Sequence, residues 1–178
     1  MRLISVIIII LLTTSAFAAE PVLEMKEAVN SFYNAYLAVH ASGVPSEKEL
    51  QKFKPYVSAS LIKLLKEADQ AEQKYQKTTK GEVPPLVEGD LFTSLFEGAT
   101  SYKVLSCDAK TSSCMVELSY VESTKGSSPF TWKDKVYPAK DSRGWLVDDI
   151  EFLGDWQFMH KGRLKDLLKD VAREGDSN

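Results

Sequence analysis

The spacing of apolar side chains changes once along this chain, and that change decides what the chain can fold into. Before residue 80 the apolar residues recur every three or four positions, which is typical of helices that bury one face. From Ser101 onward they alternate with polar residues, which is typical of strands with one buried face. We therefore expect a helical first half followed by an antiparallel sheet.

Three helices are expected in the first half. The first spans about 21–41 and carries one apolar stripe, made of Val22, Met25, Val29, Phe32, Tyr36 and Val39. Ser46 and Glu49 have the spacing of a capping box, which predicts the start of a second, short helix. Either Ser58 or Ser60 is expected to cap the third helix, which becomes polar toward its end.

The second half predicts four strands joined by short turns. Their expected ranges are 102–107, 114–122, 130–140 and 145–153. The preceding segment, 86–100, is irregular but rich in large apolar residues, so we expect it to fold back onto the core. A last helix is expected over about 156–174. The fold class is therefore α+β: N-terminal helices packed on one bent four-stranded antiparallel sheet, plus a C-terminal helix.

The N-terminus has the pattern of an export signal. An unbroken apolar run over residues 3–12 follows the single basic residue Arg2, and Ala16-Phe17-Ala18 is a small-x-small cleavage signal. A run of about 10 residues is too short for a membrane-spanning helix, which needs about 20. We predict a signal peptide over 1–18 that is cleaved after Ala18. The mature chain, 19–178, then forms a single domain with its core over about 22–155, no membrane span and a periplasmic or secreted location.

The distribution of charge limits the classes of partner that we expect, and the two cysteines limit the expected chemistry. The 22 Lys and Arg are interspersed with 25 Asp and Glu, and loss of Arg2 changes the net charge from −3 to −4. Without a basic stripe, nucleic acid is not expected as a partner. Cys107 and Cys114 form an even pair in an exported chain, which predicts a disulfide across the end of a hairpin. A redox pair is the alternative, although the spacing is not C-x-x-C.

The order of these elements resembles a known superfamily. The first helix carries Phe32-Tyr33-x-x-Tyr36-Leu37, the irregular segment carries G-D-L-F-T-S at Gly89 to Ser94, and the last strand carries W-L-V-D-D-I at Trp145 to Ile150. Over about 25–155 this resembles the nuclear transport factor 2-like (SnoaL-like, cystatin-like) fold and, within it, an uncharacterised family of exported bacterial proteins. The resemblance implies a cone in which helices line the concave face of a bent sheet, often around a pocket. Its members include isomerases, dehydratases and protein-binding adaptors, so the fold does not choose a function.

Two carboxylates are candidate catalytic bases. Strict alternation places Asp148 on the same strand face as Leu146 and Ile150, and burial of that face would raise the pKa of its carboxyl. Alternatively, Asp148 is a structural acceptor of hydrogen bonds from a helix end or a tyrosine. Asp90, in the irregular segment, is either a second candidate base or the acceptor of an Asx-turn or helix cap.

Aromatic residues supply the remaining candidates for ligand binding. Tyr33, Tyr36, Phe92 and Trp145, with Asp148, are expected to line a pocket if one exists, and core packing is the alternative for these aromatic side chains. His40 and His160 are separated too widely to form a recognisable metal motif, so neither a metal nor a cofactor is predicted.

Three classes of function remain open. The first is a non-enzymatic exported binding protein for a protein or a small apolar ligand, for example an immunity protein against a secreted toxin. The second is a small isomerase or hydro-lyase that uses Asp148 or Asp90 as its base. The third is an accessory domain of a larger envelope assembly. The sequence does not indicate an oligomeric state.

Overall fold

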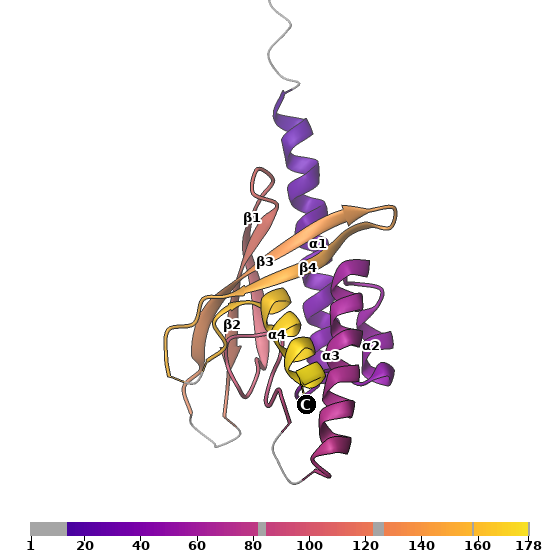
Figure 1. Cartoon of the computed structure of the whole chain (residues 1–178). Helices are drawn as coiled ribbons and strands as arrows, with labels where there is room; N and C mark the ends of the chain where they lie inside the picture. Colours follow the sequence, from indigo (N-terminus) through magenta and orange to yellow (C-terminus); the bar gives the residue numbers. More distant parts are fainter. Residues whose placement is uncertain (1–13, 82–84, 123–126, 158, 178) are drawn as a thin grey trace, which may run out of the picture.

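The computed structural model describes residues 14–81, 85–122, 127–157 and 159–177 (Figure 1). Three helices come first: α1 (Thr14–Val39), α2 (Glu47–Phe53) and α3 (Ala59–Thr78). Four strands follow: β1 (Ser101–Asp108), β2 (Ser113–Tyr120), β3 (Phe130–Asp141) and β4 (Gly144–Phe152). A short strand, β5 (Gly162–Arg163), leads directly into α4 (Leu164–Ser177). The prediction of a mixed α+β protein with an antiparallel sheet is confirmed.

The sheet has the order β1-β2-β3-β4-β5, and each neighbouring pair is antiparallel. The predicted number of four strands is wrong, because β5 adds a fifth by pairing Arg163 with Glu151 and Gly162 with Phe152. A two-residue strand is too short to produce a readable alternation. The last helix consequently starts at Leu164 and not at 156, since Gly162 has a φ of 76°, which a right-handed helix does not allow.

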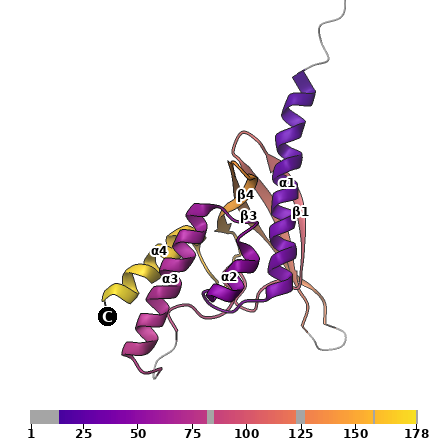
Figure 2. The same ribbon diagram turned by 90° about the vertical axis from the view of Figure 1, so that its right-hand side faces the viewer.

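The helices are arranged in two groups (Figures 1 and 2). Helix α1 packs against β1 and β4, while α3 and α4 pack against each other. The expected apolar stripe of α1 is confirmed at Met25, Val29, Phe32 and Tyr36, which are buried. Helix α1 starts at Thr14, upstream of the predicted start, so Pro21 lies inside it. The apolar run of the predicted signal peptide, 3–12, lies outside the described residues.

Helix caps follow the predicted pattern. The Ser46 amide and hydroxyl both donate to Glu49 Oε2, at 3.0 and 2.6 Å, at the start of α2. Ser58, and not Ser60, is the N-cap of α3, since its hydroxyl accepts the Leu61 amide at 3.0 Å. Over the described ranges, none of the helices is sufficiently long and apolar to cross a membrane.

A proline in β3 interrupts the pairing with β4. Tyr137 lies opposite Asp149, but the next residue, Pro138, lies opposite Val147, so Asp148 is left without a cross-strand partner. Proline has no N–H to donate to a strand ladder, and such positions are typical sites of a β-bulge. The bulge breaks the strict alternation on which the predicted orientation of Asp148 depended.

The disulfide prediction is confirmed. Cys107 and Cys114 lie directly opposite each other in the β1–β2 pair, with Cα atoms 4.0 Å apart, and form a disulfide. The bond closes the end of this hairpin over a sequence separation of 7 residues. In the chain-entropy treatment, a loop of this size stabilises the folded state by about 2.5 kcal/mol.

Candidate functional site

The segment between α3 and β1 has no regular secondary structure, yet much of it is buried. The buried side chains are Val87, Asp90, Leu91, Phe92, Thr93, Ser94 and Ala99. The prediction that this segment folds back onto the core is therefore confirmed. Buried irregular backbone must find hydrogen-bond partners outside a helix or sheet. Two buried carboxylates, Asp90 and Asp134, act as such partners.

Asp90 is the acceptor around which the segment turns. Its Oδ1 accepts the Phe92 amide at 2.9 Å, and its carboxylate also accepts a hydrogen bond from the Thr93 amide, while the Thr93 hydroxyl donates to the Leu95 carbonyl at 3.2 Å. A further hydrogen bond comes from the hydroxyl of Tyr36 on α1. The interpretation of Asp90 as the acceptor of an Asx-turn is confirmed.

Tyr36 joins the two ends of this turn. While its hydroxyl donates to Asp90, the same oxygen accepts the Ala99 amide at 2.8 Å. The Asp90 amide in turn donates to the Phe96 carbonyl at 2.7 Å. Gly98 lies against both side chains, because a Cβ there would be 2.7 Å from the Tyr36 hydroxyl and 2.9 Å from Asp90 Oδ2. We define residues 89–98 as the Asp90 loop.

Burial makes the Asp90 carboxyl a weak acid. Loss of solvent raises its pKa to about 6, even though hydrogen bonds from Tyr36, Thr93 and Phe92 act in the opposite direction. Burial, and next the charge of Asp90, raise the pKa of Tyr36. The Tyr36 hydroxyl therefore keeps its proton and continues to donate it to Asp90.

Asp134 on β3 is the second buried acceptor, and its side chain has no solvent exposure. It accepts the Ser94 amide at 2.8 Å, the Ser94 hydroxyl, the Leu153 amide at 2.9 Å and Trp132 Nε1 at 3.1 Å. These bonds tie the Asp90 loop to β3 and to the chain leaving β4. The sequence analysis missed Asp134, although alternation along β3 places it between the apolar residues Trp132 and Val136.

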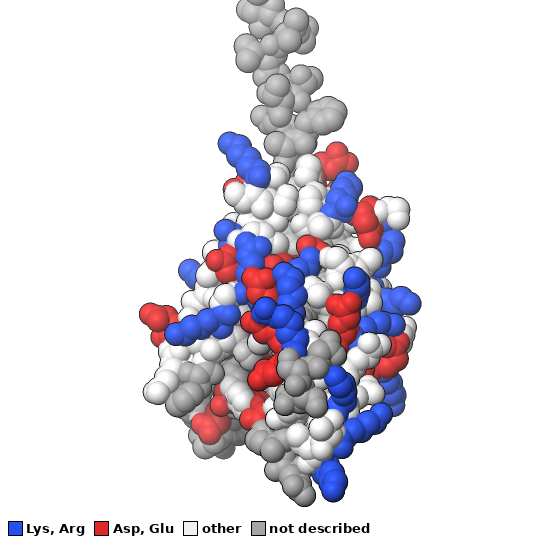
Figure 3. Space-filling view, viewed as in Figure 1, with Lys and Arg blue, Asp and Glu red and all other residues white. Residues whose placement is uncertain are grey.

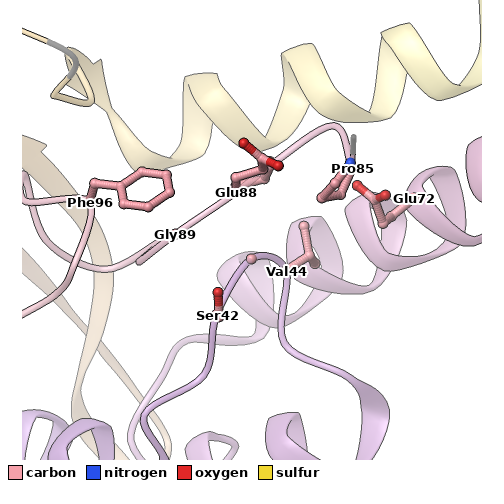
Figure 4. A pocket seen from close by; sticks show the side chains of 9 residues that line it. Ser42, Val44, Glu72, Pro85, Glu88, Gly89 and Phe96 are labelled. Carbon is pink, nitrogen blue, oxygen red and sulfur yellow. The ribbon is translucent and has the colours of Figure 1, made fainter. Parts of the chain in front are cut away.

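Two adjoining clefts lie where the Asp90 loop meets the chain between α1 and α2, and Figure 4 shows the first of them. Their volumes are about 390 and 340 Å³. The first is lined by Ser42, Gly43, Val44, Glu72, Pro85, Val87, Glu88, Gly89 and Phe96. The second is lined by His40, Ala41, Ser42, Gly89, Asp90, Phe96 and Glu97. Ser42, Gly89 and Phe96 line both clefts, so we treat the two clefts as one and call it the Phe96 cleft.

Phe96 is a fixed and exposed aromatic side chain at this cleft. It is 48% exposed, similar to Phe130 at 45%. Its position depends on Gly89: a Cβ there would lie 2.6 Å from the Phe96 ring and 2.7 Å from its carbonyl oxygen. Gly89 also has a φ of 74°, which favours glycine. The ring therefore lies directly over backbone and remains open to solvent on its other side.

The aromatic residues predicted to bind a ligand lie elsewhere. Tyr33, Tyr36 and Phe92 are at most 1% exposed, and the ring centroids are 5.8 Å apart for Tyr33–Tyr36 and 6.3 Å for Tyr36–Phe92. Their arrangement is that of core packing. Trp145 is partly exposed and donates its Nε1 hydrogen to Glu24 at 3.0 Å. The residues that line the Phe96 cleft include none of these four.

The prediction of a raised pKa for Asp148 is wrong. Partial burial alone would raise the pKa, but hydrogen bonds from Lys165, Ser58 and Ser60, and the charge of Lys165, outweigh it and lower the pKa. Lys165 Nζ lies 2.6 Å from Asp148 Oδ2, and the two serine hydroxyls donate to Oδ1 at 2.5 and 2.6 Å. Because Ser58 caps α3, the alternative of a structural acceptor at a helix end is confirmed. The bulge buries Asp149 in its place.

Among the described residues, neither a group of metal ligands nor the charges on the face in Figure 3 indicate a second site. Among the residues that the structure describes, no three His, Cys, Asp or Glu side chains are grouped so that they could hold a metal ion. His160 donates its Nε2 hydrogen to the Asp90 carbonyl at 2.7 Å, since a carbonyl oxygen only accepts. On the face shown in Figure 3, basic and acidic side chains alternate.

Asp90 is expected to stabilise the fold as the pH falls through 6. The folded protein binds this proton with a pKa of about 6, whereas an unfolded chain releases it near 3.8, so the free energy of unfolding gains about 2 kcal/mol between pH 7 and pH 4. Asp90→Asn cannot titrate and should lose this gain. Urea denaturation of both proteins at both pH values measures it, and the comparison cancels the other carboxyls. An identical pH dependence in the variant would contradict the assignment.

Asp134 is expected to matter more for stability than Asp148. In Asp134→Asn an amide NH₂ would face buried donors, and the free energy of unfolding should fall by about 3 kcal/mol. Asp148, whose side chain is 27% exposed and ion-paired, should cost about 1 kcal/mol or less as Asp148→Asn. Chemical denaturation of the two single variants at pH 7 measures the difference. Equal losses would contradict the central role of Asp134.

Comparison with known proteins gives matches among the solved structures. No protein-family model matches this chain, and no curated protein matches it. A crystal structure of a protein of unknown function from Bacteroides thetaiotaomicron VPI-5482 matches with a TM-score of 0.35 and 16% sequence identity, over 77% of this chain and 92% of that one. A similarity at this level does not bear on the fold family or the function of this chain.

Proposed function

We propose that this chain is an exported, non-enzymatic binding protein, and that it holds a protein partner at the Phe96 cleft. The observation that carries the proposal is the position of Phe96: an aromatic side chain 48% exposed, on a loop whose backbone is tied to buried groups. Aromatic side chains in such positions supply large apolar contact area at little cost in conformational entropy. The loop therefore presents a binding surface that is formed before the partner arrives.

The support for a rigid surface comes from the Asp90 loop. Its amides and hydroxyls are held by Asp90 and Asp134, and its two ends are joined by the Tyr36 hydroxyl. The Gly43 amide, on the opposite side of the cleft, donates to the Gly89 carbonyl at 2.6 Å. Both sides of the cleft are thus connected, and binding requires little ordering of the backbone.

Export and fold family are part of the same proposal. The apolar run before Ala16-Phe17-Ala18 supports cleavage after Ala18 and a periplasmic or secreted location, in which the disulfide is stable. We infer membership of the nuclear transport factor 2-like superfamily from the sequence resemblance. The packing of α1 against β1 and β4, and the bulge in β4, are consistent with a cone of this type.

One observation favours the alternative of a small isomerase or hydro-lyase. Asp90 has the raised pKa of a general base, contacts a tyrosine hydroxyl and belongs to the lining of the Phe96 cleft. Its carboxylate, however, accepts hydrogen bonds from Phe92, Thr93 and Tyr36, and the residue is only 6% exposed. A substrate would have to displace one of these donors, so we rank catalysis second.

Site-specific photo-crosslinking in the exporting cell tests the binding proposal. A benzoylphenylalanine replaces Phe96 in one variant and Phe130, which is 45% exposed, in a matched control. We expect a discrete covalent adduct from position 96, identified by mass spectrometry, and no such adduct from position 130. Absence of an adduct at 96, or the same adducts at both positions, would contradict a partner at the Phe96 cleft.

A further inference from the structure

The charges around the Phe96 cleft have one sign. Its lining includes Glu72, Glu88, Glu97 and the buried Asp90, and no Lys or Arg is among the described residues that line it. Among the described residues of that lining, His40 is the only His, Lys or Arg. This contrasts with the alternating charges of the face in Figure 3.

Two of these glutamate side chains form no hydrogen bond or ion pair within the described part of the chain. Glu72 is engaged, since it accepts the Leu86 amide at 2.8 Å and the Gln76 side-chain amide at 3.0 Å. Glu88 and Glu97 are exposed, and neither forms an ion pair or hydrogen bond with another described residue. Their charges are therefore available to a partner.

These two glutamates adjoin Gly89 and Phe96 in the sequence and line the cleft with them. Glu88 precedes Gly89, over which the Phe96 ring lies, and Glu97 directly follows Phe96. The two ends of the loop are joined here by the hydrogen bond from the Asp90 amide to the Phe96 carbonyl, at 2.7 Å. Figure 4 shows the Glu88 side chain beside the Phe96 ring, with Ser42 across the cleft.

From this juxtaposition, and resting on the proposed function, we propose that the occupant of the Phe96 cleft is a basic segment of a partner protein. An apolar or aromatic side chain of that segment packs on Phe96, and Lys or Arg side chains of the same segment pair with Glu88 and Glu97. Opposite charges flanking an apolar contact give both orientation and selectivity against acidic segments. A cation near Phe96 is further favoured by the electron-rich face of the ring.

A peptide titration tests the ligand class without knowledge of the partner. The probes are acetyl-Lys-Phe-Lys-amide and acetyl-Glu-Phe-Glu-amide, added to the ¹⁵N-labelled mature protein at low and at 0.3 M salt. The amides of Gly43 and Gly89 report on the cleft because both residues line it. We expect the basic peptide alone to shift these signals saturably, with an affinity that falls at least about 3-fold at high salt.

Matched variants separate charge from aromatic contact. The double variant Glu88→Gln/Glu97→Gln should weaken binding of the basic peptide about 5- to 10-fold and remove its salt dependence. Phe96→Ala should weaken it at least about 10-fold at both salt concentrations. Glu27→Gln and Phe130→Ala, both at exposed positions outside the cleft, should leave the affinity within about 2-fold of wild type.

The possible failures are distinguishable. Equal shifts by the acidic peptide, or unchanged binding in the double glutamine variant, would overturn a basic ligand. If the photo-crosslink at position 96 still captured a partner, the proposed function would stand and only the ligand class would fail. If no crosslink formed at 96 and neither peptide shifted the glycine amides, the cleft would not be a binding site and both proposals would fail.

Discussion

The hydrogen bonds accepted by the Asp90 carboxylate hold the loop that carries Phe96. Without Asp90, the amides of Phe92 and Thr93 would be buried without an acceptor, and the Tyr36 hydroxyl would lose its contact with the loop. Desolvation of a buried carboxylate destabilises the folded state, and the raised pKa of Asp90 reflects this cost. The hydrogen bonds to the carboxylate partly offset this cost, and they hold the backbone that places Phe96 over Gly89. Asp134 secures the same loop from the sheet side, through Ser94.

Much of the fold follows from local patterns that can be recognised in the sequence. The stripe on α1, the capping box at Ser46 and Glu49, the cap at Ser58 and the cysteine pair each depend on residues close together in the chain. These features arise from short-range geometry, so neighbouring residues are enough to predict them.

The features that escaped prediction depend on residues distant in the chain. Asp148 was assigned to the buried face because its own strand alternates, but the bulge that turns it outward is set by Pro138 on the neighbouring strand. The β5 strand exists only because Arg163 meets Glu151. Lys165, 17 positions after Asp148 in the printed sequence, neutralises that carboxylate. For the candidate site, Asp90 could be found from sequence, whereas the exposure of Phe96 depends on the closure of the whole loop.

The distribution of aromatic side chains between the interior and the surface bears on the function of this chain. The aromatic interior formed by Tyr33, Tyr36 and Phe92 is packed, so the residues that would line a pocket in a hollow cone instead support the loop from beneath. The exposed Phe96 ring, Glu88 and Glu97 line the cleft at the surface of the protein. A rigid loop that carries its binding groups outward fits recognition of another macromolecule better than enclosure of a small substrate.

The central claim is that a buried Asp90 carboxylate organises the loop that carries Phe96. It is tested most directly by following the ¹³Cγ resonance of Asp90 through a pH titration, together with the amides of Phe92 and Thr93. The account predicts that the carboxyl titrates near pH 6 and that both amides shift with the same midpoint. Titration near pH 4, with amides that do not respond, would mean that the carboxyl is in solvent and that another interaction shapes the loop.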